Sequence, residues 1–115
     1  GTTAIYEKYN TGYYKDSNCG TEMHTSANGI TVPEKTGYTF GGYYTSTNGG
    51  GTQYIDANGK LTSSASTTNF TADGTLYAKW TANVYTISLN NQSATTAGTA
   101  SIYEKYNFFF YYFNR

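Results

Sequence analysis

The chain has 115 residues, a mass of 12.6 kDa and no formal net charge, with seven basic and seven acidic side chains. This length suits one domain with a modest core and leaves too little chain for two. The neutral balance and the pI near 6.8 argue against a nucleic-acid partner, and no apolar run approaches the roughly 20 residues of a membrane-spanning helix.

The composition predicts a mainly β fold. Aromatic residues make up 18% of the chain because it contains 14 tyrosines. Apolar residues never recur with helical spacing over a useful window, and short runs of Tyr, Thr, Val and Ile alternate with turn residues. We expect at most one or two short helical turns, around residues 21–27 and 61–66. The Asn-Gly and Asp-Gly pairs at 28–29, 48–49, 58–59 and 73–74 favour the positive φ angles of tight hairpin turns.

In the first half of the chain, a strand is expected at residues 5–9. Residues 30–32 are also β-prone, and Pro33 is expected to end that strand or to place it at an edge. In the segment 37–40, Tyr38 and Phe40 would face the same way. The Gly41-Gly42 pair that follows predicts a bulge or a bend.

In the second half, strands are expected at residues 76–80, 84–89 and 102–106. Because side chains alternate along a strand, each of the first two strands should have one face that is more apolar than the other. In the first, this face holds Leu76, Ala78 and Trp80, and Tyr77 and Lys79 point away. In the second, Tyr85, Ile87 and Leu89 alternate with Val84, Thr86 and Ser88.

The start of the chain is repeated near its end. Residues 1–10 have the sequence GTTAIYEKYN and residues 98–107 have GTASIYEKYN, so Ile102 repeats Ile5 at a spacing of about 97 residues. This period is the size of a domain, longer than the repeats of solenoids. We therefore expect the parent polypeptide to be an array of domains, or to have descended recently from one. Because the sequence has no initiator Met and no leader, we expect a mature chain or an excised piece. It would hold one full period and a second copy of the opening strand.

Two spaced motifs resemble those of a known family. Residues 37–44 have the sequence GYTFGGYY, a glycine-rich loop follows at 48–52, and residues 76–80 have LYAKW. With Val32 and Pro33 ahead of the first motif, they resemble the InlB B-repeat (Listeria–Bacteroides repeat) family, whose signature is GYTF-x-GWY, a glycine-rich loop and a closing LYAKW strand. Tyr43 stands where the family usually has Trp. The resemblance covers residues 30–80 well and 84–107 more loosely.

The resemblance implies a small β-grasp-like (ubiquitin-like) module that is repeated in tandem in bacterial surface or secreted proteins. Such repeats act as spacers or adhesive segments and carry no catalytic residues. It also implies that the natural unit starts near Val84 and ends at Trp80 of the next copy. Residues 1–83 would then be a repeat domain that lacks its own first strand, because that strand is displaced to the C-terminal end of the chain. Residues 84–107 would be the opening strands of the next copy, followed by an aromatic tail at 108–115.

A missing first strand has a physical consequence, because it leaves an open backbone edge and an uncovered apolar face. Residues 84–89 would either fold back into their own domain or enter the gap in a neighbouring chain. Strand addition repeated head to tail would build a filament, with segment 102–106 competing with 5–9 for the same slot. The run of six aromatic residues at 108–113 is expected to be buried within such an assembly. The residues assigned to this assembly strand are Val84, Tyr85, Ile87, Leu89, Ile102, Tyr103 and Tyr106.

The residues that carry enzyme chemistry are sparse. Cys19 is the only cysteine, so neither an internal disulfide nor a Cys-based zinc site can form. His24 is the only histidine, and its spacing from Asp16, Cys19 and Glu22 matches no metal-binding pattern. We expect no catalytic residue, no metal and no cofactor, although a hydrolase that depends on His24 stays open as a lesser alternative. An isopeptide bond from Lys8 or Lys79 to Asn10 or Asn83 is less favoured than a solvated strand face.

The tyrosines give the competing hypothesis. Exposed rings can stack on sugars or on a partner protein, although many of the tyrosines must serve as core because Leu, Ile, Val and Met are few. The candidate contact surface is Tyr13, Tyr14, Tyr43, Tyr44 and Tyr54. Our leading expectation is a non-enzymatic structural or adhesive repeat module of an extracellular or surface protein of bacteria, which assembles with itself. The alternative is a monomeric glycan- or protein-binding module that uses these tyrosines.

Overall fold

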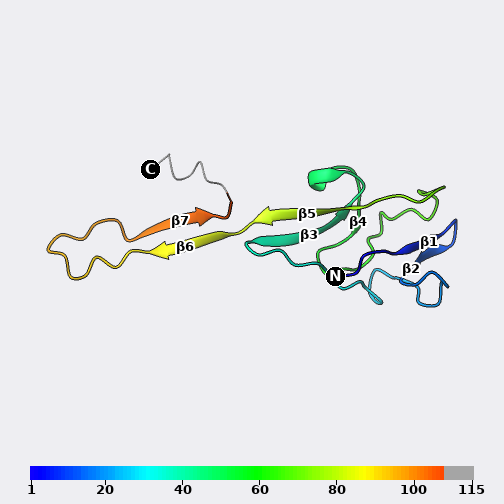
Figure 1. Ribbon diagram of the computed structural model, residues 1–115, viewed down its shortest axis with the longest axis horizontal. Coiled ribbons are helices and arrows are strands. Elements are labelled where there is room, and N and C mark those ends of the chain that lie inside the picture. Colours follow the sequence, from blue (N-terminus) through cyan, green and yellow to red (C-terminus); the bar gives the residue numbers. More distant parts are fainter. Residues whose placement is uncertain (108–115) are drawn as a thin grey trace.

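The computed structural model describes residues 1–107, and the aromatic tail expected at 108–115 lies outside the described residues. The molecule is elongated, with extents of 70 × 25 × 21 Å and a Cα radius of gyration of 20.5 Å, against about 13 Å for a compact domain of roughly 100 residues. Figure 1 shows the reason, since a β-hairpin extends from one end of a thicker part. We call residues 1–82 the body and residues 84–105 the hairpin.

The fold is mainly β, as predicted, and consists of three small antiparallel sheets: β1–β2, β4–β3–β5 and β6–β7. Residues 1–107 contain one single-turn 3-10 helix and no α-helix, and a β-grasp-like arrangement is not confirmed. The elements in chain order are β1 (Tyr6–Lys8), β2 (Gly12–Tyr14), β3 (Tyr38–Tyr44), η1 (Thr47–Gly49), β4 (Gln53–Ile55), β5 (Tyr77–Ala82), β6 (Val84–Ser88) and β7 (Ser101–Lys105).

The strands with a clear alternating pattern lie where the sequence predicts them. The segments 5–9, 37–40, 76–80, 84–89 and 102–106 correspond to β1, β3, β5, β6 and β7. Within β5, Ala78 and Trp80 are half-buried while Tyr77 and Lys79 are exposed, as expected. β2 and β4 are additional strands of three residues each, too short to show a two-residue period.

The Gly41-Gly42 pair forms the predicted bulge in β3. The register between β3 and β5 shifts between Phe40 and Tyr43. Gly42 has a φ of 106°, and a Cβ added there would lie 2.4 Å from the carbonyl oxygen of Ile55. Only glycine fits this position, because both the backbone angle and the close approach of β4 exclude a side chain.

The predicted turns form at two of the four Gly pairs, 48–49 and 58–59, whereas at 28–29 only the positive φ of Asn28 is present. Asn48 and Gly49 both have positive φ, and the Gly50 N–H donates to the Thr47 carbonyl at 3.1 Å, which gives a two-residue hairpin turn between β3 and β4. Asn28 and Gly59 also have positive φ in their pairs. The prediction is wrong at residues 73–74, where neither φ is positive. Residues 73–74 form no turn and lead into β5.

The two expected helical turns are wrong because both segments hydrogen-bond to neighbouring strands. Near residue 22, the Met23 N–H donates to the Tyr13 carbonyl at 2.8 Å. Near residue 61, the Thr62 N–H donates to the Tyr54 carbonyl at 2.9 Å. A backbone group that is hydrogen-bonded to a strand cannot also form the hydrogen bond of a helix. The strand expected at 30–32 does not form, and this segment is joined to the N-terminus where the Thr2 N–H donates to the Thr31 carbonyl.

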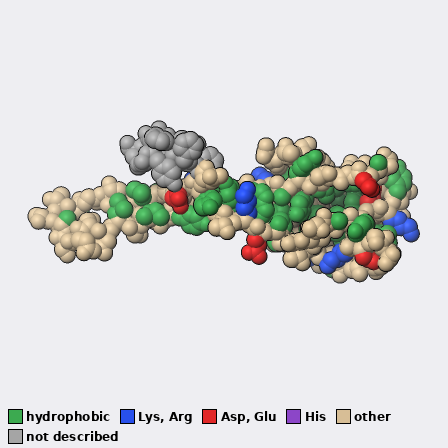
Figure 2. All heavy atoms as spheres, viewed as in Figure 1, with side chains coloured by type: hydrophobic (Ala, Val, Ile, Leu, Met, Phe, Trp, Pro, Cys, Tyr) green, Lys and Arg blue, Asp and Glu red, His purple; other side chains and the backbone are tan. Residues whose placement is uncertain are grey.

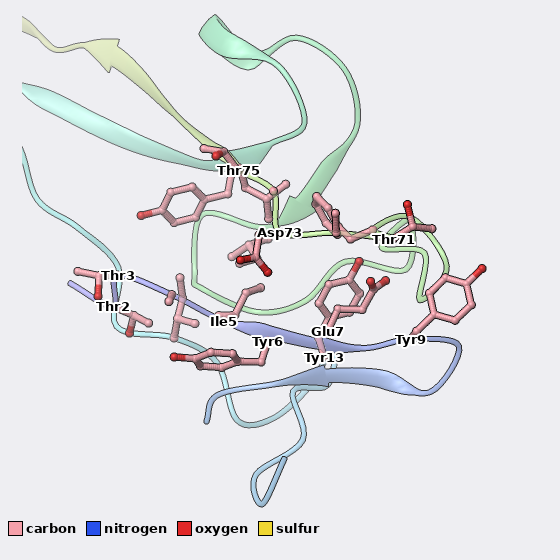
Figure 3. Close-up of a pocket in the computed structure, with 18 residues that line it drawn as sticks. Thr2, Thr3, Ile5, Tyr6, Glu7, Tyr9, Tyr13, Thr71, Asp73 and Thr75 are labelled. Atoms are coloured by element: carbon pink, nitrogen blue, oxygen red, sulfur yellow. The ribbon is translucent and has the colours of Figure 1, made fainter. Parts of the chain in front are cut away.

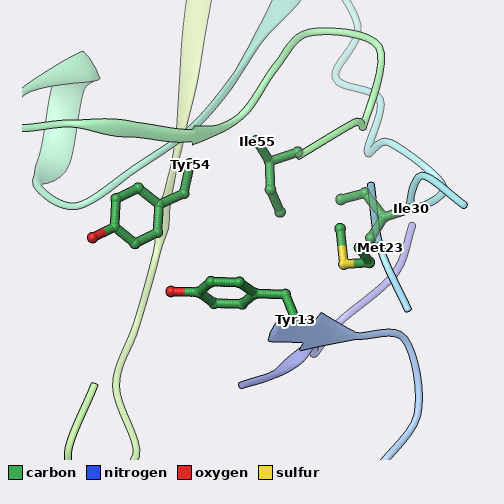
Figure 4. Packing of buried hydrophobic residues seen from close by; sticks show 5 residues of the cluster. All are labelled: Tyr13, Met23, Ile30, Tyr54 and Ile55. Atoms are coloured by element: carbon green, nitrogen blue, oxygen red, sulfur yellow. The ribbon is translucent and has the colours of Figure 1, made fainter. Parts of the chain in front are cut away.

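The core of the body is small and rich in tyrosine. The Tyr13 and Tyr54 rings meet edge to face, with centroids 6.2 Å apart, and Figure 4 shows them beside the other core side chains. Tyr13 can be buried because its hydroxyl donates to the Ser66 carbonyl at 2.6 Å. The buried cluster consists of Tyr13, Met23, Ile30, Tyr54 and Ile55, and the partly buried side chains packed against it are Ile5, Tyr43, Leu61, Ala65, Phe70 and Leu76.

Candidate functional site

The two strands of the hairpin expose apolar side chains, whereas the loop between them is polar. β6 and β7 pair from Val84 opposite Lys105 to Ser88 opposite Ser101, and every residue of β6 is exposed. Figure 2 shows hydrophobic side chains along this projection. A two-stranded ribbon without a core is marginally stable in water, so this apolar surface is suited to being covered. The exposed fractions are Val84 62%, Tyr85 41%, Ile87 42%, Leu89 39%, Ile102 47% and Tyr103 63%.

β6 does not complete the sheet of its own body. It continues away from the end of β5 and pairs with β7 (Figure 1). Of the two placements expected for residues 84–89, the return into their own domain is therefore not the arrangement of this chain.

Tyr106 fixes the base of the hairpin to the body. Its N–H donates to the Asn83 carbonyl at 2.9 Å, and its ring meets that of Tyr38 edge to face, with centroids 5.4 Å apart. The ring also lies over Gly37, where an added Cβ would come within 2.3 Å of it. Tyr106, expected in the assembly strand, thus packs against its own chain.

An open groove of about 980 Å³ lies beside β1 in the body. Figure 3 shows β1 on one side and the segment with Thr71, Asp73 and Thr75 on the other. β1 pairs with β2 along one edge only, and Ile5, Phe70 and Leu76 line the groove while remaining only partly buried. The groove therefore leaves part of the apolar surface of the core uncovered, beside the unpaired edge of β1.

Glu7 gives the groove its main polar feature. Its Oε2 is buried and has no hydrogen-bond partner among residues 1–107. Burial raises the pKa of the Tyr13 hydroxyl above its ordinary value of 10, and the negative charge of Glu7 raises it further. A buried carboxylate oxygen without a donor is costly, so the groove favours an occupant that brings one.

The prediction that five tyrosines form an exposed contact surface is wrong in part. Tyr13 and Tyr54 are 2% and 4% exposed and belong to the core, because they lie on the inward faces of β2 and β4. Tyr14, Tyr43 and Tyr44 are half-buried. The structure therefore does not gather the five rings on one exposed surface.

A different aromatic surface lies on the body near the hairpin. Tyr38, Phe40 and Trp80 line a shallow pocket of about 280 Å³. The Lys35 ammonium lies 4.4 Å from the Tyr38 ring centroid and 5.9 Å from that of Trp80. This cation–π contact occupies the aromatic faces within the chain, and no pattern in the sequence signals it.

The residues considered for catalysis have structural roles or are exposed. The Asp16 carboxylate accepts the N–H groups of Gly20 and Thr21, and these bonds lower its pKa below the ordinary 3.8. His24 is exposed and Cys19 is a free thiol. Within residues 1–107, no three His, Cys, Asp or Glu side chains gather at a metal-binding distance.

Comparisons with protein-family models, with curated proteins and with solved structures gave no match. The resemblance to the InlB B-repeat family therefore stays a prediction. In the part of the chain that the structure describes, no helix has the length and apolar character needed to cross a membrane.

Proposed function

We propose that this chain is a non-enzymatic structural or adhesive repeat module that assembles with itself, head to tail, through its projecting hairpin. The placement on a bacterial surface or outside the cell rests on the family resemblance of residues 30–80. The assembly rests on the chain's own geometry.

The observation that carries the proposal is that one molecule has two separate uncovered surfaces, the apolar side chains of β6 and the groove beside β1. One end exposes the apolar side chains of β6, among them Ile87 at 42% and Val84 at 62%. The body has an open strand edge beside a groove of about 980 Å³. Two such surfaces on one chain favour a heterologous contact, and such contacts continue into rings or filaments when they are repeated.

The test is the size of the full-length protein in solution as its concentration rises, measured by light scattering and by electron microscopy. We expect ordered polymers from the native chain. The double variant Tyr85→Asp/Ile87→Asp should remain a monomer, because charges are costly to bury in an interface. The matched control, Thr95→Asp/Thr96→Asp, adds the same charge in the exposed loop between β6 and β7 and should still polymerise.

A truncated chain that ends at Asn107 tests whether polymers form through the hairpin or through the aromatic tail at 108–115. It should form the same polymers as the full chain. Native chains that stay monomeric at every concentration would contradict the proposal and favour the monomeric binding module.

A further inference from the structure

We propose that β6 of one copy pairs with β1 of the next copy, in the register that β6 has with β7 in the free chain. This inference rests on the proposed self-assembly and adds the acceptor, the register and the buried face. In the free chain β6 pairs with β7 of its own copy, and on assembly β1 of the next copy takes the place of β7.

The repeat makes the two acceptor strands equivalent. Residues 5–9 and 102–106 have the same sequence, IYEKY. In the hairpin, Ile87 lies opposite Ile102, Thr86 opposite Tyr103 and Tyr85 opposite Glu104. Replacing β7 by β1 therefore places Ile87 opposite Ile5, Thr86 opposite Tyr6 and Tyr85 opposite Glu7. Four of the five cross-strand pairs keep the same residue types, and only Ser88 changes its partner, from Ser101 to Ala4, so exchange costs little in cross-strand pairing.

The backbone of β1 presents the correct groups for this register. The Tyr13 carbonyl accepts from Met23, on the side of β2 away from β1. Backbone groups alternate between the two edges of a strand, so Gly12 and Tyr14 bond to their partners in β1, Lys8 and Tyr6. The N–H and C=O groups of Ile5 and Glu7 consequently point to the free edge.

The hairpin has the matching alternation on its side. The Leu89 N–H donates to Ala100 and the Tyr106 N–H donates to Asn83. By the two-residue alternation, Tyr85 and Ile87 are the residues of β6 that exchange hydrogen bonds with β7. In the transferred register these two meet Glu7 and Ile5, whose backbone groups face the free edge. A shift by one residue would break this match.

The side-chain faces agree with the same register. Ile5 and Glu7 are partly buried, whereas Tyr6 and Lys8 are exposed, although Tyr6 also lines the groove. Directly opposite residues in a sheet point to the same side. The register therefore turns Tyr85, Ile87 and Leu89 toward the core and leaves Val84, Thr86 and Ser88 in solvent. The more apolar face of β6 is the one that becomes buried.

The groove also suits this occupant chemically. Among the described residues that line it, Glu7 and Asp73 are the only ionisable groups besides tyrosines, and both are acidic. β6 contains no charged residue, so nothing in it is repelled by these carboxylates. The register brings Tyr85, a hydroxyl donor, beside Glu7, whose Oε2 has no hydrogen-bond partner among the described residues.

The joint between copies is completed by Tyr9. It occupies the place in the first repeat that Tyr106 has in the second, and it is 57% exposed. When β1 of the next copy replaces β7, its Tyr9 takes the position of Tyr106 over Gly37 and Tyr38. The contact between bodies then reproduces the one already present between a body and its own hairpin.

Disulfide trapping tests the register in the full-length chain. With Cys19→Ser as background, chains carrying Thr86→Cys are mixed with chains carrying Tyr6→Cys and oxidised mildly. Both positions are exposed, and opposite residues at a non-hydrogen-bonded pair lie about 4.5 Å apart at Cα, within the range of a disulfide. The control, Thr86→Cys with Lys8→Cys, is displaced by two residues, roughly 7–8 Å, and should cross-link at least about tenfold less.

A second full-length variant separates strand exchange from docking of the intact hairpin. Ile102→Pro weakens β7, because proline cannot donate to the ladder and disfavours a paired strand. Exchange predicts more polymer and more Thr86–Tyr6 cross-link, since β6 is released. Docking of an intact hairpin predicts less of both, and that result would overturn the inference.

The outcomes also distinguish the two proposals. Polymers that form without the Thr86–Tyr6 cross-link, or with equal cross-linking at Lys8, would overturn the register and leave the proposed assembly standing. Absence of polymers in the native chain at any concentration would contradict the assembly itself, and the inference with it.

Discussion

The two copies of the repeated segment have one sequence and two environments. In the body, β1 lies beside β2 and next to the core, but its other edge is open to the groove. In the hairpin, β7 is paired with β6 but has no core beneath it, and its Tyr103 is 63% exposed against 40% for the equivalent Tyr6. Each copy has what the other lacks. The comparison teaches that neither copy of the segment has both a fully paired strand and a core beneath it.

The same contrast extends to stability. The body owes its order to a small buried cluster, whereas the hairpin depends on its ladder and on the contact of Tyr106 with Tyr38. Equivalent substitutions in the two regions should therefore differ widely in effect. Unfolding of the body can be followed by the fluorescence of Trp80, the single tryptophan of the chain.

The largest difference is expected between two isoleucines. Ile55 is 2% exposed and Ile87 is 42% exposed. Ile55→Ala should lower the free energy of unfolding by about 2–5 kcal/mol, because it leaves a cavity. Ile87→Ala should change it by less than about 1 kcal/mol in the monomer. Denaturant unfolding at low protein concentration checks both, and equal losses would break the distinction between body and hairpin.

Two glycines sharpen the comparison for the backbone. Gly42→Ala should cost about 1–3 kcal/mol from its φ of 106° alone, with the contact to Ile55 adding to it. Gly98 lies in the loop of the hairpin, where an added Cβ would meet nothing within 4 Å. Gly98→Ala should stay within about 0.5 kcal/mol of the native chain. Thermal unfolding of the two variants measures the difference, and a tolerated Gly42→Ala would argue against the bulge.

A smaller effect is expected from one hydroxyl. Tyr13→Phe removes the donor of the 2.6 Å bond to the Ser66 carbonyl and should destabilise the body by about 1–3 kcal/mol. Tyr103→Phe, at a residue 63% exposed, is the matched control and should be close to neutral. Denaturant midpoints that do not differ between these variants would show that Tyr13 is not buried as described.

The smallest effect is confined to alkaline solution. Because burial and Glu7 raise the pKa of Tyr13 in the folded chain above its ordinary 10, the unfolded state releases this proton first as the pH rises. The contribution of Tyr13 to stability is therefore complete below pH 10 and is lost above it. Unfolding between pH 9 and about 11 should show a steeper loss in the native chain than in Tyr13→Phe. Parallel pH profiles would contradict this assignment.

Much of the fold follows from local pattern, and the rest depends on contacts between distant segments. β3, β5 and β6 alternate over enough residues to show their period, and the Gly41-Gly42 bulge is visible as a pair of glycines. Residues 21–27 and 61–66 are decided by hydrogen bonds to β2 and β4, which no local window contains. The neighbours Tyr13 and Tyr14 have the same side chain, so only the face of β2 that meets the core separates the buried ring from the half-buried one.

The candidate site was accessible to the sequence only through its repeat. The duplicated IYEKY segment predicted a second copy of the opening strand, and the structure contains it as β7. The displaced first strand and the gap were implied by the family resemblance and stay predictions. The buried Oε2 of Glu7 and the place of Tyr106 over Gly37 depend on tertiary geometry, and no spacing in the sequence signals either.

The central claim is tested most directly by the native mass of the full-length chain, measured by sedimentation over a wide range of concentrations. The account predicts ordered species much larger than the 12.6 kDa chain, which grow with concentration and disappear in Tyr85→Asp/Ile87→Asp. A 12.6 kDa monomer throughout the range would contradict it, because the hairpin would then not bind the body of another copy.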